Sequence, residues 1–205
     1  MSRIQPKAHI AYPWYLRLMY RIQRKRYGFE LIPTQVWGRQ PILFRRFLAF
    51  FRGLERKQSP LDPVLRALIT VRVSQINHCA FCIDFNSMRV LKGGGQAKLE
   101  ALPEFENSEH LSDKEKSALA YAEAVTHSDR EADDALFKRL REHFDDDALV
   151  ELTALIAFQN MSSKFNAALD LPSQGLCQLS PEQTNAADED RVRAMTRAED
   201  RRDSR

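Results

Sequence analysis

The sequence predicts an all-α protein, and three observations support this fold class. Apolar residues recur at helical spacing through most of the chain. Only seven of the 205 residues are glycine, which is few for a β-rich fold with many tight turns. Hydrophobic residues make up 43% and charged residues 29%, as in ordinary globular proteins. No run reaches the roughly 18 uncharged apolar residues of a membrane span, and the N-terminus lacks the apolar core of a signal peptide. We therefore expect a cytoplasmic protein, in which a disulfide is transient and catalytic.

The first part of the chain is basic and aromatic. Residues 1–60 hold thirteen Lys and Arg but only two acids, Glu30 and Glu55. Such a segment can pack against an acidic surface of its own chain or of a neighbouring subunit, or bind an anionic membrane or nucleic acid. No nucleic-acid motif accompanies it, so we expect no nucleic-acid partner. Contact of residues 14–26 with a membrane surface is the less favoured interpretation.

Helical spacing predicts the first two helices within this segment. Aromatic and basic residues are mixed at roughly helical spacing over residues 12–27, and Pro33, Gly38 and Pro41 mark a connector. Residues 41–53 read as a helix with proline in its first turn. One face of it is apolar, and we expect this face to lie in the core or in a subunit interface rather than on a membrane: Phe44, Phe47, Leu48 and Phe51.

Two helices follow, with a short break between them. Apolar residues from Val64 to Ile76 keep helical spacing; their β-branched side chains would also suit a strand, but the length and the lack of turn residues favour a helix. A second pattern runs over residues 80–92 and stops at three glycines, a strong helix end. Because asparagine favours helix ends, we place the break near Asn77 and His78.

The C-terminal half predicts three more helices and a charged tail. Ser112 and Glu115 match a capping box that opens the first of them. Asp129 is expected to cap the second. The third, over residues 148–169, starts after a run of aspartates and is apolar on most of its early surface, as in a buried central helix. We divide the chain into a basic helical extension (1–58), a helical domain (59–179) and a charged tail expected to be disordered (180–205).

The motif Cys79-Ala80-Phe81-Cys82 carries the chemistry. Cysteines at positions i and i+3 of a helix share one face and are close enough for a disulfide. If the helix restarts near His78, both sulfurs lie in its first turn, where free N–H groups and the dipole stabilise a thiolate. The second thiol can then resolve a mixed disulfide or a sulfenic acid, so the spacing supports reversible dithiol chemistry.

Three other interpretations of the pair stay open. A CxxC can supply half of a zinc site, but Cys177 is the only other cysteine, so zinc is disfavoured and we expect no metal or other cofactor. The two cysteines can be inert core residues. They can also be a vestige of redox chemistry in a chain that has lost its proton relay.

Three blocks of sequence resemble the carboxymuconolactone decarboxylase / alkylhydroperoxidase D (AhpD)-like family. Residues 65–86 resemble its core around the CxxC, and residues 111–126 and 150–160 resemble its second and third blocks, in the same order. The resemblance covers residues 59–171; the N-terminal extension resembles one found in only some members. It implies an AhpD-like helical bundle that forms a homo-oligomer (dimer, trimer or hexamer).

The resemblance also implies an activity. It implies an antioxidant peroxidase of peroxiredoxin type or a disulfide reductase, with a peroxide or disulfide as substrate and a thiol compound as electron donor. Cys82 corresponds to the cysteine that attacks the peroxide and Cys79 to the one that resolves it. Decarboxylase members lack the CxxC, which disfavours lactone decarboxylation.

The sequence departs from the peroxidase pattern wherever a proton relay is expected. Ala67 stands where a glutamate precedes the first cysteine by twelve residues, and Phe81 and Asn86 stand where two histidines flank the second. Deprotonation must then rely on the helix terminus, on His78 or on groups elsewhere in the fold. Asn86 can hydrogen-bond a thiolate or water but cannot take a proton. The predicted site is thus Cys82, Cys79, His78 and Asn86.

These observations leave two hypotheses for the function. The first is a CxxC-dependent oxidoreductase. The alternative is a non-enzymatic, oligomeric, redox-responsive protein with a degenerate relay. Glu123 and Arg72 are expected to form ion pairs rather than to serve the cysteines, and Asp84, two residues after Cys82, is expected to point away from it.

Overall fold

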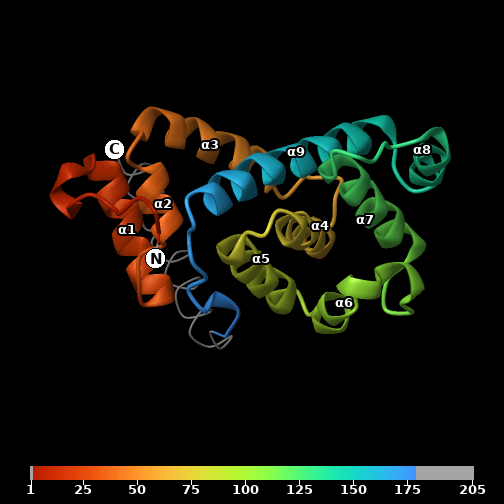
Figure 1. The fold of residues 1–205 in the computed structure, drawn as a ribbon, viewed down its shortest axis with the longest axis horizontal. Coiled ribbons are helices and arrows are strands. Elements are labelled where there is room, and N and C mark those ends of the chain that lie inside the picture. Colours follow the sequence, from red (N-terminus) through yellow and green to blue (C-terminus); the bar gives the residue numbers. More distant parts are fainter. Residues whose placement is uncertain (1, 179–205) are drawn as a thin grey trace, which may run out of the picture. The chain divides into compact units, whose positions relative to one another are not determined.

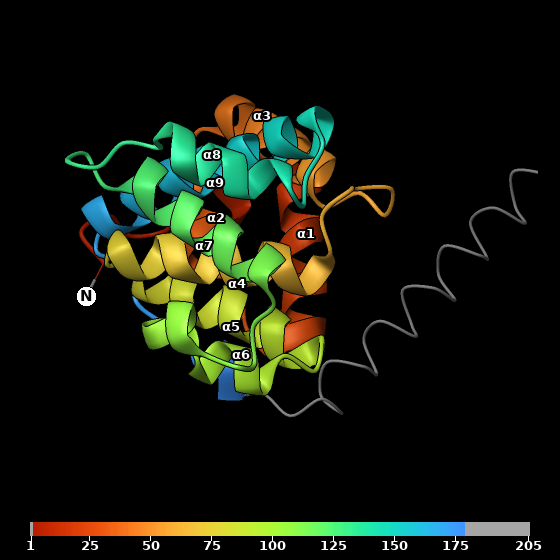
Figure 2. The same ribbon diagram turned by 90° about the vertical axis from the view of Figure 1, so that its right-hand side faces the viewer.

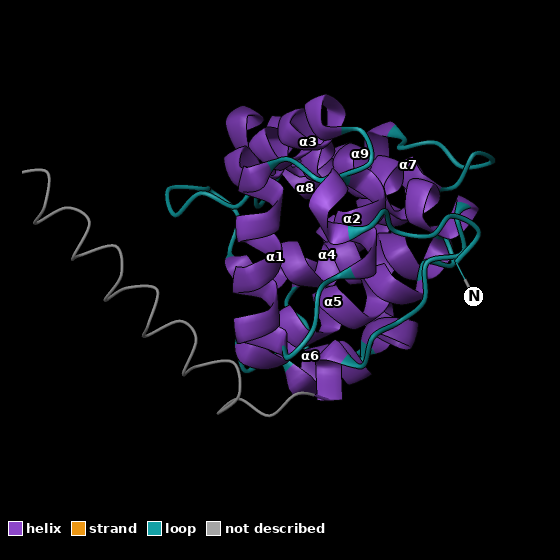
Figure 3. Cartoon of the chain, turned by 90° about the vertical axis from the view of Figure 1, so that its left-hand side faces the viewer, coloured by secondary structure: helices purple, strands orange, loops and turns teal. Residues whose placement is uncertain are grey.

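The computed structural model describes residues 2–178, which contain helices and loops and no strand (Figure 3). This confirms the predicted all-α class. The chain forms two compact units. The first combines residues 2–5 with residues 42–177. The described part of the second is residues 6–41 together with Gln178. The predicted tail, 180–205, lies outside the described residues.

The second unit contains a short 3₁₀ turn, η1 (His9–Ala11), and two helices, α1 (Trp14–Tyr27) and α2 (Ile32–Trp37). The helix predicted over residues 12–27 is confirmed, whereas α2 falls in the stretch interpreted as a connector. Proline in its first turn is compatible with a helix, because that N–H has no partner within a helix. The hydroxyl of Tyr12 accepts the N–H of Lys7 (2.8 Å) and donates to the carbonyl of Gln35 (3.0 Å).

The first unit is a helical bundle built around α4. Its helices follow in chain order, with 3₁₀ segments η2 and η3 (Figure 1): α3 (Pro41–Leu54), α4 (Pro63–Ile76), α5 (Ala80–Lys92), α6 (Gln96–Glu100), η2 (Leu102–Asn107), α7 (Asp113–Thr126), α8 (Asp134–Arg141), α9 (Asp146–Ala168) and η3 (Leu176–Gln178). Helix α4 contacts α5, α7 and α9 (Figure 2). Because it is covered on several sides, its apolar residues point in every direction rather than along one stripe.

Side chains close in sequence cap these helices. Asp62 caps α4 and accepts the N–H groups of Val64 and Leu65. Ser112 and Glu115 form the predicted capping box of α7, and Asp145 caps α9. The prediction that Asp129 caps the next helix is wrong. That helix, α8, begins four residues later, and Asp133 is its cap, with its carboxylate accepting the N–H of Leu136 at 2.8 Å.

The apolar face of α3 lies partly in the core. Phe44 is buried, and Phe47 and Phe51 pack against the ring of Phe158 on α9, with ring centroids 4.8 and 6.0 Å apart. Most of α3 therefore belongs to the first unit. Among residues 2–178, no helix combines the length and the apolar character needed to cross a membrane.

Candidate active site

A sharp break between α4 and α5 places the two cysteines. Helix α4 ends at Ile76, and His78 takes a left-handed backbone conformation (φ 53°). Cys79 is extended and is the N-cap of α5, and its N–H donates to the carbonyl of Ser74 (3.0 Å). The break predicted near Asn77 and His78 is confirmed, and it puts Cys79 and Cys82 at the N-terminus of α5.

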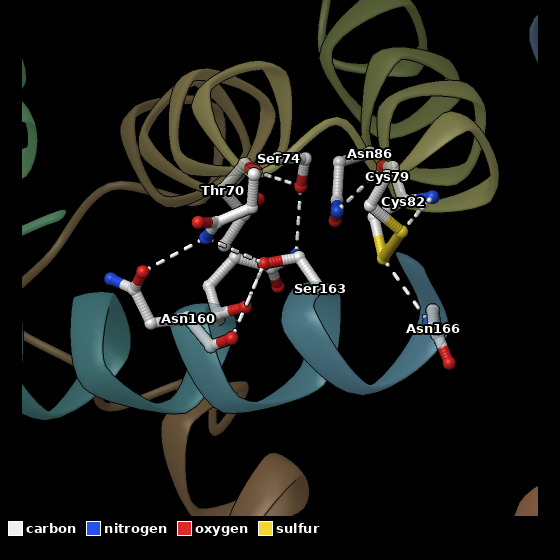
Figure 4. The surroundings of a disulfide bond; sticks show 10 residues. Thr70, Ser74, Cys79, Cys82, Asn86, Asn160, Ser163 and Asn166 are labelled. Carbon is white, nitrogen blue, oxygen red and sulfur yellow. Dashed lines mark hydrogen bonds between the residues drawn. A yellow bond between two sulfur atoms is a disulfide. The ribbon is translucent and has the colours of Figure 1, made fainter. Parts of the chain in front are cut away.

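Cys79 and Cys82 form a disulfide, with Cα atoms 5.3 Å apart (Figure 4). Only 1% of Cys79 and 3% of Cys82 is exposed. The Cys79 sulfur occupies the capping position and accepts the N–H of Cys82 at 3.2 Å. One sulfur therefore receives a hydrogen bond from the positive end of the helix, where a thiolate is stabilised.

The second sulfur has a donor from a distant part of the chain. The side-chain amide of Asn166, near the end of α9, donates to the Cys82 sulfur at 3.2 Å (Figure 4). Asn166 is 3% exposed, and its side-chain carbonyl has no hydrogen-bond partner in the described structure. Each sulfur thus accepts one N–H, from a different source.

A partly buried polar network holds α9 against the break that carries the cysteines. Asn77 donates to the side chains of Asn160 (2.8 Å) and Ser163 (2.9 Å) on α9. One turn away, Gln159 donates to the hydroxyl of Ser74 on α4 (2.8 Å). Figure 4 shows this network beside the disulfide. Because hydrogen bonds are directional, it fixes the register of α9 against the turn before Cys79.

The other residues predicted for the site lie beside the sulfurs without bonding to them. His78 is exposed. The amide of Asn86 donates to the backbone carbonyl of Cys82 (2.9 Å), and its oxygen accepts from Arg89 (3.1 Å). Of the residues at the expected relay positions, Ala67 is buried in α4 and Phe81 stacks on Phe85.

Glu123 and Arg72, each expected to be ion-paired rather than to serve the cysteines, form an ion pair with each other. Arg72 donates to Glu123 through Nε (2.7 Å), and Arg130 donates to the other carboxylate oxygen (2.9 Å). These three side chains help to line an open recess of about 660 Å³ between η2 and α7, and neither cysteine lines it. The recess is therefore separate from the candidate redox site.

Asp84 fastens the segment after α9 to the helix that carries the cysteines. Its buried carboxylate accepts the N–H groups of Gln174 (2.9 Å), Leu176 (3.0 Å) and Cys177 (2.8 Å) and the hydroxyl of Ser173 (2.9 Å). Burial alone would raise the pKa of Asp84, but these hydrogen bonds outweigh it and hold the pKa below its usual range. In the described residues the Asp84 carboxylate is hydrogen-bonded to this segment and not to the Cys82 sulfur.

Cys177 is the described thiol outside the pair, and we expect it to react slowly. Burial raises its pKa, and the hydrogen bond to Asp84 and the charge of that carboxylate raise it further. At neutral pH, iodoacetamide should therefore modify Cys177 in the reduced, folded protein more slowly than in an unfolded peptide of the same sequence. Mass spectrometry measures both rates. Asp84→Asn should accelerate this reaction, and an equal or slower rate would contradict the assignment.

Sequence reasoning did not find Asn166. A signal was present, because Gln159, Asn160, Ser163 and Asn166 recur at three- or four-residue spacing on a helix whose first half is mostly apolar. A polar face on a buried helix indicates a buried hydrogen-bond network. Its direction toward the cysteines depends on how α9 packs, which spacing alone does not give.

Comparisons with known proteins agree with this architecture. The model of the carboxymuconolactone decarboxylase family matches residues 41–124. The chain is 46% identical to the uncharacterized protein YnjA of Escherichia coli (strain K12) over 168 residues, which cover 82% of this chain and 92% of YnjA.

Two solved structures share the fold. One is an uncharacterized peroxidase-related protein from Ralstonia eutropha JMP134, described as an alkylhydroperoxidase AhpD core (TM-score 0.75, 21% identity, covering 89% of this chain and 94% of that one). The other is the debrominase Bmp8 (TM-score 0.74, 22% identity, covering 90% and 97%). At this level of identity the likeness concerns the fold.

Proposed function

Because the chain belongs to the carboxymuconolactone decarboxylase family, we propose that it is a thiol–disulfide oxidoreductase that reduces peroxide or disulfide substrates with Cys82 and Cys79. The observation that carries the proposal is the arrangement of the two sulfurs. They lie in the first turn of α5, are joined as a disulfide, and each accepts a hydrogen bond from an N–H group. Such donors favour the thiolate, which is the reactive form.

With a hydroperoxide, the Cys82 thiolate attacks one peroxide oxygen and the O–O bond breaks. The leaving alkoxide or hydroxide takes a proton, and Cys82 becomes a sulfenic acid. The Cys79 thiol then attacks the Cys82 sulfur, the S–O bond breaks, and water leaves as the disulfide forms. The two electrons come from the dithiol, so each cycle needs a thiol donor to restore it; we propose a separate thiol protein or small dithiol for this role.

With a disulfide substrate the same sulfurs act in the same order. The Cys82 thiolate forms a mixed disulfide and releases one substrate thiol. Cys79 then displaces the second thiol and closes the Cys79–Cys82 bond. Both reactions end in the disulfide present in the structure, so this disulfide agrees equally with either substrate class.

A second candidate function follows from the surroundings of the sulfurs. In residues 2–178 no imidazole or carboxylate is hydrogen-bonded to either sulfur, and both sulfurs are nearly enclosed. Without a general base, proton transfer in the first step is less efficient. The chain would then act as a redox-responsive protein that forms the disulfide slowly and signals through it. Its assembly as a homo-oligomer stays a prediction.

Stopped-flow oxidation of the reduced protein distinguishes the two candidates. With excess hydrogen peroxide or an organic hydroperoxide, we expect oxidation faster than that of free cysteine, with a rate that rises linearly with peroxide concentration. Mass spectrometry should identify the Cys79–Cys82 disulfide as the product. If neither peroxide nor a model disulfide such as oxidised glutathione reacts faster with the reduced protein than with free cysteine, the oxidoreductase proposal is wrong and the redox-responsive function is favoured.

A further inference from the structure

We propose that Asn166 sets the charge state of Cys82, with its side-chain amide as the hydrogen-bond donor that stabilises the Cys82 thiolate. This proposal rests on the proposed function and deepens it, because it assigns a positioning residue to the attacking sulfur. Asn166 lies 84 residues after Cys82, on another helix. An amide cannot take a proton, so Asn166 would stabilise the thiolate without replacing the base that is missing at the relay positions Ala67, Phe81 and Asn86.

The burial of Asn166 is explained by its bond to sulfur. The side chain is 3% exposed, and its hydrogen bond in the described structure is the one from Nδ2 to the Cys82 sulfur (3.2 Å). Its carbonyl oxygen is buried without a partner. Leaving a buried polar atom unpaired costs free energy, so an apolar residue would pack better here unless the amide served another purpose.

The amide is held in place before any substrate arrives. Asn77, two residues before Cys79, is hydrogen-bonded to Asn160 and Ser163, which precede Asn166 by about two and one helical turns. Just beyond α9, the carboxylate of Asp84 binds the segment from Ser173 to Cys177 back onto α5. The helix is thus tied to the cysteine region on both sides of Asn166, and a donor fixed in this way needs no rearrangement when charge develops.

Reduction changes what this hydrogen bond contributes. A disulfide sulfur is a weak acceptor, whereas a thiolate carries a full negative charge, and hydrogen bonds to ions are about twice as strong as neutral ones. Burial by itself raises the pKa of a thiol, because it removes the water that solvates the thiolate. At Cys82 the Asn166 N–H opposes that effect. Cys79 has a backbone donor instead, so a substitution of Asn166 acts selectively on Cys82.

The charged groups on the helices around Cys82 are engaged elsewhere. Helix α5 packs against α4, α6 and α9. The ionisable side chains on these helices and on the adjoining segments have other partners or are exposed: Arg66 and Arg89 with Glu55, Arg72 with Glu123, Lys98 with Glu115, Glu100 with Gln96, Glu151 with Arg56, Asp84 with residues 173–177, Asp62 with Val64 and Leu65, Asp145 with Ala148, Asp146 with Arg141, and His78, Lys92, Asp147, Lys164 and Asp170 at the surface. Asn166 is therefore the side chain whose replacement most directly changes the polarity at Cys82.

The test compares two replacements of almost equal size. Asn166→Leu removes the donor, and Asn166→Asp puts an anionic acceptor where the donor was. In full-length protein that carries Cys79→Ser and Cys177→Ser, we would titrate the Cys82 thiol by thiolate absorbance and by its rate of reaction with iodoacetamide. We expect the pKa of Cys82 to rise by about one unit with leucine and to rise further with aspartate.

The charge order separates this role from a structural one. If Asn166 only supported packing, the pKa would not increase from asparagine to leucine to aspartate, and a flat or reversed order would overturn the proposal. Thr153→Val is the matched control. It removes a partly buried hydroxyl from α9, bonded to the carbonyl of Leu149 and paired with Tyr121, more than three turns before Asn166, and should leave the pKa unchanged.

The outcome for Asn166 can be told apart from failure of the proposed function. If Asn166→Leu does not shift the pKa of Cys82 while peroxide or disulfide reduction still depends on Cys82, only the role of Asn166 is wrong. If the unmodified protein reduces no substrate but the pKa order is seen, the role of Asn166 stands and the oxidoreductase proposal fails. Circular dichroism of each variant verifies that the helices are retained before the titration.

Discussion

Cys82→Ser removes the ability of the reduced protein to consume peroxide or to reduce a disulfide. A serine hydroxyl stays protonated at neutral pH and cannot form a sulfenic acid or a mixed disulfide, so both proposed reactions lose their first step. With dithiothreitol as electron donor, we expect turnover to fall by on the order of a thousandfold or more, to the rate of the donor alone. Residual turnover near the unmodified rate would show that Cys82 is not the attacking residue.

The other two cysteines supply matched controls for this experiment. Cys79→Ser should still react once with peroxide, because the attacking thiol is intact. The resulting sulfenic acid on Cys82 should then persist and be trapped by a sulfenic-acid reagent such as dimedone, because no neighbouring thiol resolves it. Cys177→Ser should turn over at the unmodified rate. If Cys79→Ser and Cys82→Ser exchange these behaviours, the order of attack and resolution is reversed.

Much of the fold follows from signals within a few residues. The break between α4 and α5 follows from asparagine at a helix end, the capping box from Ser112 and Glu115, and the end of α5 from three glycines. Each of these is set by backbone groups that need partners close in sequence. The prediction of the α8 cap failed because several aspartates precede this helix, and spacing does not distinguish Asp129 from Asp133.

The helices that the sequence did not reveal are short. Helices α2 and α6 have six and five residues, too few to show a hydrophobic period. In isolation such helices are also unstable, so their formation depends on tertiary packing rather than on local propensity. Proline and glycine around α2 indicate a turn when read alone, and the helix forms nevertheless between them.

In the candidate site too, the local features could be predicted from the sequence and the long-range contacts could not. The CxxC and its place at a helix N-terminus follow from spacing alone. The hydrogen bond of Asn166 to Cys82 and those of Asp84 to residues 173–177 do not. Their partners lie more than 80 residues away, and the contacts depend on how α9 and the segment after it pack on α5. Asn86 was expected to hydrogen-bond a thiolate or water because it follows Cys82 by four residues. In the structure its amide is used by the backbone carbonyl of Cys82 and its oxygen by Arg89.

The second large effect is expected at Asp84. Asp84→Ala removes a buried acceptor that binds three backbone N–H groups and a hydroxyl, so these donors, one of them buried and the others partly buried, lose this partner. Since hydrogen bonds to a charged group contribute more than neutral ones, we expect a loss of about 3 kcal/mol in the free energy of unfolding. Urea denaturation measures it. The matched control is Asp133→Ala, which removes an exposed cap with a single N–H and should cost about 1 kcal/mol.

The pH dependence of this loss identifies its cause. The folded protein holds the pKa of Asp84 below its usual range, so the carboxylate contributes its full stabilisation above the unfolded pKa and loses it as the pH falls through the folded one. The difference in free energy of unfolding between the unmodified protein and Asp84→Asn should therefore be constant near neutral pH and shrink in acid. A difference that stayed the same down to strongly acidic pH would show that Asp84 stabilises the protein by packing rather than by its charge.

The hydrogen bonds of Asp84 to residues 173–177 also tie the segment after α9 to α5. Asp84→Asn should therefore weaken the hydrogen bond of Asn166 to Cys82 and slow iodoacetamide modification of Cys82, while it accelerates that of Cys177.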